Sequence, residues 1–286
     1  GLAALALPAV LRPAPESELP AVELTTAGPA PAREPVVVTP VFEAPRPIDF
    51  DVFPLAVRRI LLDPGHGGQD TGTTGGGLVE KVMTLDIALR LRDLLVEQGF
   101  EVHLTREEDH AVSLRERAQQ ANSLRADLFV SIHINWIAER SVRGLETYFL
   151  GPTDDPELTE LTRRENLSSS GYSLADMKTL LEGLYTGVRQ NESRQLAEQV
   201  QRSLYRSLLR QNPTLKDRGV KTAPFMVLVA TEMPAILAEV SCLSNEQEAK
   251  LLARPLYRQH IAEALSRGIR SYADETNQSE AKGADG

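Results

Sequence analysis

Strand-like and helix-like patterns of apolar residues alternate along the chain from residue 58 to residue 272. Short, continuously apolar runs are typical of buried strands. The sequence predicts such strands at "RRILLDPG", "FEVHLTR", "ADLFVSIHIN", "GLETYFLG", "FMVLV" and "AILAEVS". Apolar positions at helical spacing predict helices over residues 82–98, 113–124, 192–209 and 256–272, and a short helix opened by Asn245.

This alternation predicts a three-layer α/β sandwich, with a mostly parallel, twisted sheet of about six strands flanked by helices. In sheets of this kind, functional sites form at the carboxyl ends of the strands. This α/β domain is expected to span residues 55–273. It includes a helical insertion at about 153–191, expected to lie over the edge of the sheet where a site would form.

The two ends of the chain have a different composition. Residues 1–54 are rich in Pro and Ala, which favours an extended, semi-rigid tether. The first eleven residues are apolar but too short to span a bilayer. They fit the remnant of a signal peptide or anchor, and they fit a fragment of disordered linker equally well. Residues 274–286 are polar and are expected to form a disordered tail.

Composition narrows the classes of function. Of 286 residues, 42% are hydrophobic and 25% are charged, as in soluble globular proteins. The net charge of −9, without a Lys/Arg-rich block, argues against a nucleic-acid partner. The only cysteine, Cys242, excludes an intrachain disulfide and a Cys-based structural zinc site.

Four residues with acid, base or metal-binding side chains follow or end predicted strands, or begin a helix. They are His66 in "DPGHGG", Glu80 in "GGGLVEK", His133 in "SIHIN" and Glu239 in "LAEVS". Two imidazoles and one carboxylate form a zinc ligand set that leaves the fourth coordination position for water. Zinc lowers the pKa of that water from about 15.7 towards about 7. A second carboxylate can then take the proton and return it to a leaving amine.

Each of these residues also has a simpler explanation on its own. His66 fits a turn, His133 fits a strand core, and Glu80 fits the first turn of a helix, where the helix dipole favours an acid. Glu239 is harder to explain, because burial of an acid among apolar residues is costly unless the acid is paired or bound. Cys242 with His133 as its base is an alternative nucleophile, but a lone buried cysteine usually acts as a small hydrophobe.

The ordered motifs "LLDPGHGGQDTG", "GLVEK", "VHLTR", "ADLFVSIHIN", "GLETYFL", "RGVKTAPFMVL" and "PAILAEVSCLSNEQE" resemble those of zinc-dependent N-acetylmuramoyl-L-alanine amidases of the bacterial cell wall. The resemblance covers nearly all of residues 58–272. It implies hydrolysis of the amide between N-acetylmuramic acid and the L-alanine of the peptidoglycan stem peptide. His66, Glu80 and His133 match the zinc ligands, and Glu239 matches the catalytic glutamate. The Ser241-Cys242 pair departs from the family's usual Gly-Phe or similar pair but removes no ligand.

The insertion at about 153–191 is longer than connections in compact domains usually are. Ser173 and Asp176 resemble a capping box before an apolar helical face at residues 174–185. That helix could simply pack on its own domain. A resemblance to amidases of dividing diderm bacteria implies instead that the insertion covers the zinc until an activator protein displaces it. Glu165 in "RREN" would be the blocking carboxylate, with Glu182 as the less favoured substitute.

The resemblance favours an exported enzyme of cell-wall remodelling and daughter-cell separation. Because peptidoglycan lies outside the cytoplasmic membrane, the expected location is the periplasm. Two other functions stay open at this point: a zinc exopeptidase on a similar α/β fold, and a non-catalytic cell-wall regulator. Product analysis separates the first from an amidase, and loss of a ligand or of Glu239 would indicate the second.

Overall fold

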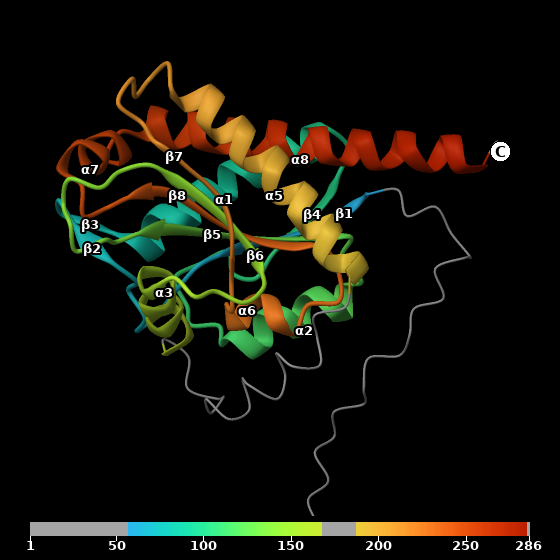
Figure 1. The fold of residues 1–286 in the computed structure, drawn as a ribbon, viewed down its shortest axis with the longest axis horizontal. Coiled ribbons are helices and arrows are strands. Elements are labelled where there is room, and N and C mark those ends of the chain that lie inside the picture. Colours follow the sequence, from blue (N-terminus) through green and yellow to red (C-terminus); the bar gives the residue numbers. More distant parts are fainter. Residues whose placement is uncertain (1–56, 168–186, 285–286) are drawn as a thin grey trace, which may run out of the picture. The chain divides into compact units, whose positions relative to one another are not determined.

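A six-stranded sheet forms the middle layer of the protein (Figure 1). The computed structural model describes residues 57–167 and 187–284. Every neighbouring pair of strands is parallel except β8 and β6, which are antiparallel. The order across the sheet is β4 (Glu101–Leu104), β1 (Arg59–Pro64), β5 (Leu128–Asn135), β8 (Ala235–Cys242), β6 (Leu145–Leu150) and β7 (Asp217–Ala223). The predicted, mostly parallel sheet is therefore confirmed.

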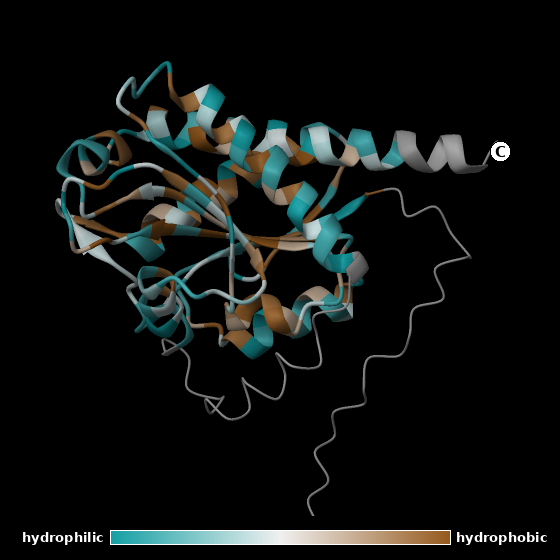
Figure 2. Cartoon of the chain, viewed as in Figure 1, coloured by the Kyte–Doolittle hydropathy of each residue, from teal (hydrophilic) through white to brown (hydrophobic). Residues whose placement is uncertain are grey.

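Helices cover both faces of the sheet, and their apolar sides face it (Figures 1 and 2). One face packs against α1 (Glu80–Glu97), α5 (Gly187–Leu208) and α8 (Pro255–Ala284), with α7 (Glu246–Leu252) leading into α8. The opposite face packs against α2 (Leu114–Leu124), α3 (Pro156–Leu167) and α6 (Met226–Val229). This arrangement is the expected three-layer α/β sandwich. A small hairpin of β2 (Thr74–Gly75) and β3 (Leu78–Val79) precedes α1.

The sheet register brings distant motifs to one edge. The two central strands, β5 and β8, are buried along their whole length, as their apolar sequences predict. His133 pairs directly with Glu239 across these strands, while Asp63 and Pro64 of β1 pair with the preceding part of β5. Because the three strands are parallel, "DPGHGG", "SIHIN" and "LAEVS" end at the same edge.

Local sequence signals set several helix ends. Ser113 and Glu116 form the predicted capping box at α2, and the Asn245 side chain accepts hydrogen bonds from two backbone amides at the start of α7. Helix α1 begins at Glu80, two residues before the expected start. Glu80 is therefore part of the first turn, and its position is fixed by the helix as well as by the hairpin.

Two predictions of secondary structure are wrong. The run "FMVLV" does not form a strand: the strand at this point is β7, which ends at Ala223, and Met226–Val229 is the short buried helix α6. A short apolar run cannot by its period be assigned to a strand or to a buried helix. The expected disordered tail at 274–286 is helical as far as Ala284. A helix already nucleated by packing propagates readily through residues such as Glu, Ala and Lys.

The insertion carries a helix that the apolar pattern did not predict, α3. Its buried residues Leu158 and Leu161 join the apolar cluster formed with α6, β6 and β8. Asn166 ties its last turn to the β7–α6 connection, donating to Pro224 O at 3.1 Å and accepting from Met226 N at 2.9 Å. The helix expected at 174–185, with Glu182, and the tether at 1–54 lie outside the described residues.

No helix in the described part of the chain has the length and apolarity needed to cross a lipid bilayer.

Candidate metal centre and active site

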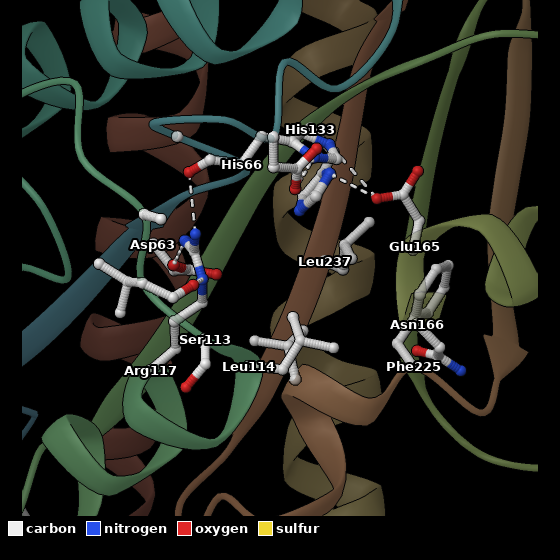
Figure 3. A pocket seen from close by; sticks show the side chains of 15 residues that line it. Asp63, His66, Ser113, Leu114, Arg117, His133, Glu165, Asn166, Phe225 and Leu237 are labelled. Atoms are coloured by element: carbon white, nitrogen blue, oxygen red, sulfur yellow. Dashed lines mark hydrogen bonds and ion pairs between the residues drawn. The ribbon is translucent and has the colours of Figure 1, made fainter. Parts of the chain in front are cut away.

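Four side-chain atoms from separate elements meet at the carboxyl edge of the sheet. Figure 3 shows three of the residues that carry them, His66, His133 and Glu165. His66 Nε2 lies 3.2 Å from Glu80 Oε1 and 3.3 Å from Glu165 Oε2. His133 Nδ1 lies 3.3 Å from each of the same two oxygens. His66, Glu80 and His133, the three residues predicted from the sequence, are thus brought together, and Glu165 of α3 joins them.

These distances suit a tetrahedral zinc site. Zinc bound at about 2.0–2.1 Å holds the corners of its tetrahedron about 3.3–3.4 Å apart. The ring nitrogens of His66 and His133 that face the cluster are buried and lack a hydrogen-bonding partner within the described residues. Two imidazoles and a carboxylate are also a common donor set for catalytic zinc. The residues present therefore fit the metal that the sequence implies.

Contacts behind the cluster orient its members. Asp70 Oδ2 lies 2.8 Å from His66 Nδ1, which directs the other ring nitrogen of His66 into the cluster. Glu80 accepts hydrogen bonds from the backbone amides of Thr73 and Ile134, each at 2.8 Å. The Glu80 carboxylate is therefore held by both its own hairpin and strand β5.

The carboxylates of the cluster favour a positive charge between them and the two imidazoles. Burial alone would lower the pKa of His133, but the carboxylates of Glu165 and Glu80 raise it to about 10. The same kind of contact raises the pKa of His66 well above its ordinary value, against the effect of burial. A divalent cation supplies the positive charge that these carboxylates favour, and its binding competes with protons for the two rings.

The glycine-rich turn after β1 is explained by close packing of the two imidazoles. A Cβ atom on Gly65 would lie 2.4 Å from His133 Nε2. Gly72 has φ of +62°, and its Cβ would lie 2.5 Å from His66 Cδ2 and 2.6 Å from Glu80 Oε2. Both positions thus exclude a side chain, because the rings and carboxylate occupy that space.

A buried network that the sequence reasoning missed holds this turn in place. The carboxylate of Asp63 accepts from Thr105 Oγ1 at 2.6 Å, Arg117 Nη1 at 2.5 Å and Ser131 Oγ at 2.7 Å. Burial alone would raise the pKa of Asp63, but the charge of Arg117 and these hydrogen bonds hold it below its ordinary value. Arg117 also donates to His66 O at 2.8 Å.

A second buried arginine forms hydrogen bonds to the same turn. Arg106 donates to Pro64 O, Gly65 O and Lys81 O at 2.8–3.0 Å. Burial lowers its pKa to about 10, so its guanidinium is still charged at neutral pH. The motifs "VHLTR" and "SLRER" contain these arginines, but no single-sequence signal distinguishes a buried arginine from a surface one.

Glu239 lies beside the cluster on β8 and is only 1% exposed. Its Oε2 atom has no hydrogen-bonding partner in the described residues. Burial raises the pKa of Glu239 well above its ordinary value; His133 opposes this shift, and Glu80 and Glu165 add to it. A carboxyl whose pKa is raised by burial is suited to taking up a proton and giving it back during a reaction.

Cys242 does not fit the alternative role of nucleophile. Its thiol is buried and lies 3.2 Å from Ser244 Oγ, and burial raises its pKa. A catalytic cysteine needs the opposite, a lowered pKa that favours the thiolate.

The comparisons with known proteins agree with this geometry. A family model described as N-acetylmuramoyl-L-alanine amidase matches residues 60–271. The chain belongs to the N-acetylmuramoyl-L-alanine amidase family. The amidase AmiA of Escherichia coli is 31% identical over 220 residues, covering 75% of this chain and 76% of AmiA.

Solved structures of amidases share the fold. AmiC2 of Nostoc punctiforme aligns with a TM-score of 0.58 and 31% identity, over 75% of this chain and 96% of AmiC2. The amidase CwlD of Clostridioides difficile, solved in complex with the GerS lipoprotein, aligns with a TM-score of 0.57 and 27% identity, over 75% of this chain and 98% of CwlD. This chain is therefore an amidase of peptidoglycan with the α/β sandwich of its family.

Proposed function

We propose that this amidase is zinc-dependent and hydrolyses the amide between N-acetylmuramic acid and the L-alanine of the stem peptide. The observation that carries the proposal is the convergence of His66 Nε2, His133 Nδ1 and Glu80 Oε1 at zinc-ligand spacing, next to buried Glu239.

The proposed mechanism assigns a task to each side chain. A zinc ion held by His66, Glu80 and His133 would polarise the amide carbonyl and lower the pKa of a water towards about 7. Glu239 takes the proton of the attacking water and delivers it to the leaving nitrogen of L-alanine. Asp70 keeps the His66 ring in the orientation that the site needs.

Metal analysis combined with product mapping tests this function. Purified chain should bind one zinc, and digested peptidoglycan should release intact stem peptides. Made together with Glu165→Ala, which opens the position that Glu165 fills, Glu239→Gln should retain the zinc while the rate falls by about 10²- to 10⁴-fold relative to Glu165→Ala alone, as expected for loss of a general acid–base. A zinc-loaded double variant that digests peptidoglycan as fast as Glu165→Ala contradicts the proposed base, and a metal-free protein contradicts the zinc site.

The position of Glu165 supports autoinhibition by the inserted segment. Its Oε2 lies 3.3 Å from both imidazole nitrogens (Figure 3). With zinc held by His66, Glu80 and His133, this carboxylate would take the fourth position, which catalysis needs for water. Its side chain is only 16% exposed. A carboxylate that takes the place of water removes the nucleophile, so we propose that α3 holds the enzyme inactive.

Substitution of Glu165 and deletion of residues 156–190 test the autoinhibition. Glu165→Ala and the deletion should both release stem peptides faster than the parent, since each opens the fourth position. Glu160→Ala, on the exposed side of the same helix, serves as the matched control and should behave like the parent. A folded, zinc-loaded deletion variant with unchanged low activity would refute autoinhibition.

We further propose that an activator protein displaces α3, in the periplasm, during daughter-cell separation. The similar amidase CwlD was solved with a lipoprotein partner, which supports regulation by a protein. Cell fractionation tests the location, and cytoplasmic recovery of the active enzyme would contradict it. Addition of a cognate periplasmic extract should raise the activity of the parent and leave Glu165→Ala unchanged.

A further inference from the structure

A second cavity, of about 680 Å³, is lined by residues from the segments that follow β5 and β8 and has no role in the mechanism above. Its size falls within the range of about 300–1,000 Å³ that is usual for ligand pockets. We call it the Trp136 groove, because its lining includes the half-exposed indole of Trp136. The polar side chains around it include Arg140, Arg143, Asn245 and Gln247.

The Trp136 groove continues directly from the elements that carry the site. Trp136 follows β5 three residues after His133, and Leu243 follows β8 four residues after Glu239. Thr74 and Gly75 of β2, in the hairpin that leads to Glu80, form another wall. The groove is therefore lined by segments that begin within four residues of His133 and of Glu239.

Hydrogen bonds fix the walls of the groove. Ile137 N donates to Ser244 Oγ at 3.1 Å, and Asn245 Nδ2 donates to Arg140 O at 2.9 Å. Arg143 Nη1 donates to Gln247 Oε1 at 2.9 Å. The loops after β5 and β8 thus form one preformed surface, which lowers the entropic cost of binding a ligand.

Helix α3 covers the aromatic platform as well as the metal cluster. The Arg164 guanidinium lies 5.7 Å from the centre of the Trp136 ring, and its Nη2 donates to Trp136 O at 2.9 Å. The next residue, Glu165, reaches the two imidazoles. Two adjacent side chains of α3 therefore contact the indole and the metal cluster.

We propose that the Trp136 groove binds the glycan strand of peptidoglycan, with one amino-sugar ring stacked on the indole where Arg164 now lies. This inference rests on the proposed function. An indole offers a broad apolar face to the C–H face of a pyranose, and the guanidinium of Arg140 and the amide nitrogen of Gln247 offer donors for hydroxyl and acetamido groups. The smaller cavity of about 200 Å³, which His66, His133 and Glu165 also line, is bounded by Leu114, Phe225 and Leu237, so it suits the peptide side of the amide.

The chain contains a single tryptophan, so its intrinsic fluorescence reports on this platform alone. Titration of the zinc-loaded full chain with tetra-N-acetylchitotetraose, a glycan without a stem peptide, should give a saturable change in emission. Arg164→Ala should tighten this binding by about 3- to 10-fold, the range expected for one aromatic stacking contact. No change in emission for the parent and for Arg164→Ala would overturn the proposal. A response to free stem peptide alone would assign the groove to peptide and overturn it too.

Kinetics on peptidoglycan separate binding from chemistry. Trp136→Ala, made in the Glu165→Ala background, should raise KM by about 3- to 10-fold and leave kcat within a factor of about two. Trp136→Phe should restore most of the loss, whereas Val96→Ala, at an exposed apolar site on α1, should have no effect. Unchanged KM in a zinc-loaded, folded Trp136→Ala variant overturns the inference and leaves the amidase function intact. Oligosaccharide binding at Trp136 without release of stem peptides would support the groove and count against the proposed function.

Discussion

At the scale of single residues, Gly65 decides how closely the metal-binding rings can approach. Any Cβ at this position would lie 2.4 Å from His133 Nε2, so Gly65→Ala must displace the His133 ring. We expect zinc affinity to fall by about 10- to 100-fold, as for other changes that disturb ligand orientation. Competition with a fluorescent chelator measures this affinity.

The control for this prediction is Gly99→Ala. Gly99 has φ of +90°, and a Cβ atom there would meet no atom of the described residues within 4 Å. This change therefore strains the backbone far from the cluster without crowding a neighbour. It should lower the unfolding temperature without lowering zinc affinity. Equal zinc affinity in Gly65→Ala and the parent would show that the ring does not need this space.

Asp63 should govern the stability of the site at acid pH. Its pKa is lower in the folded protein than its unfolded value of about 3.9, so its ionised form stabilises the fold above that value. This contribution is lost as the pH falls from about 4 through the folded pKa. Asp63→Asn leaves buried Arg117 without its charge partner and should cost about 3 kcal/mol at pH 7.

Urea unfolding at a series of pH values measures this effect. The difference in unfolding free energy between the parent and Asp63→Asn should be largest at neutral pH and should shrink below about pH 4. Asp93→Asn, at an exposed position on α1, provides the comparison and should follow the parent. A difference that does not change with pH would contradict the assigned ionisation.

At the scale of elements, the anchoring of α3 should set the basal activity. Asn166→Ala removes two hydrogen bonds, to Pro224 O and from Met226 N, each worth about 0.5–1.5 kcal/mol. A weaker anchor populates the displaced state of α3, so hydrolysis should become several-fold faster while zinc content stays the same. Dye-release assays on labelled peptidoglycan measure the rate. Slower hydrolysis by Asn166→Ala would mean that α3 assists catalysis.

The same scale shows what the sequence could and could not predict. Continuous apolar runs predicted β5 and β8, because strands buried on both faces have no polar side to break the pattern. The strand predicted at Met226–Val229 is wrong, because four buried residues are too few to show whether their spacing is that of a strand or of a helix. Helix α3 was missed because only Leu158, Leu161 and a few neighbours face the core, in a segment otherwise polar.

At the scale of the whole molecule, topology explains why the candidate site was predictable. Parallel strands place their carboxyl ends at one edge, so His66, which follows β1, could be grouped with His133 and Glu239, which lie in the carboxyl-terminal halves of β5 and β8. The sequence could not predict the roles of Arg106, Arg117 and Trp136. These roles arise from contacts across the fold that no local pattern records.

The proposed zinc should also stabilise the whole fold, since the residues that would bind it come from the turn after β1, from α1 and from β5. A ligand present at 100 times its dissociation constant stabilises the folded state by about 2.7 kcal/mol. For a domain of this size, that corresponds to a rise in unfolding temperature of roughly 5–10 °C. Calorimetry of zinc-loaded and chelator-treated protein measures the rise.

His133→Ala removes one ligand and should abolish most of the zinc-dependent shift, whereas His103→Ala, at an exposed strand position, should preserve it. If the parent unfolds at the same temperature with and without zinc, the three residues do not bind the metal together in the folded chain.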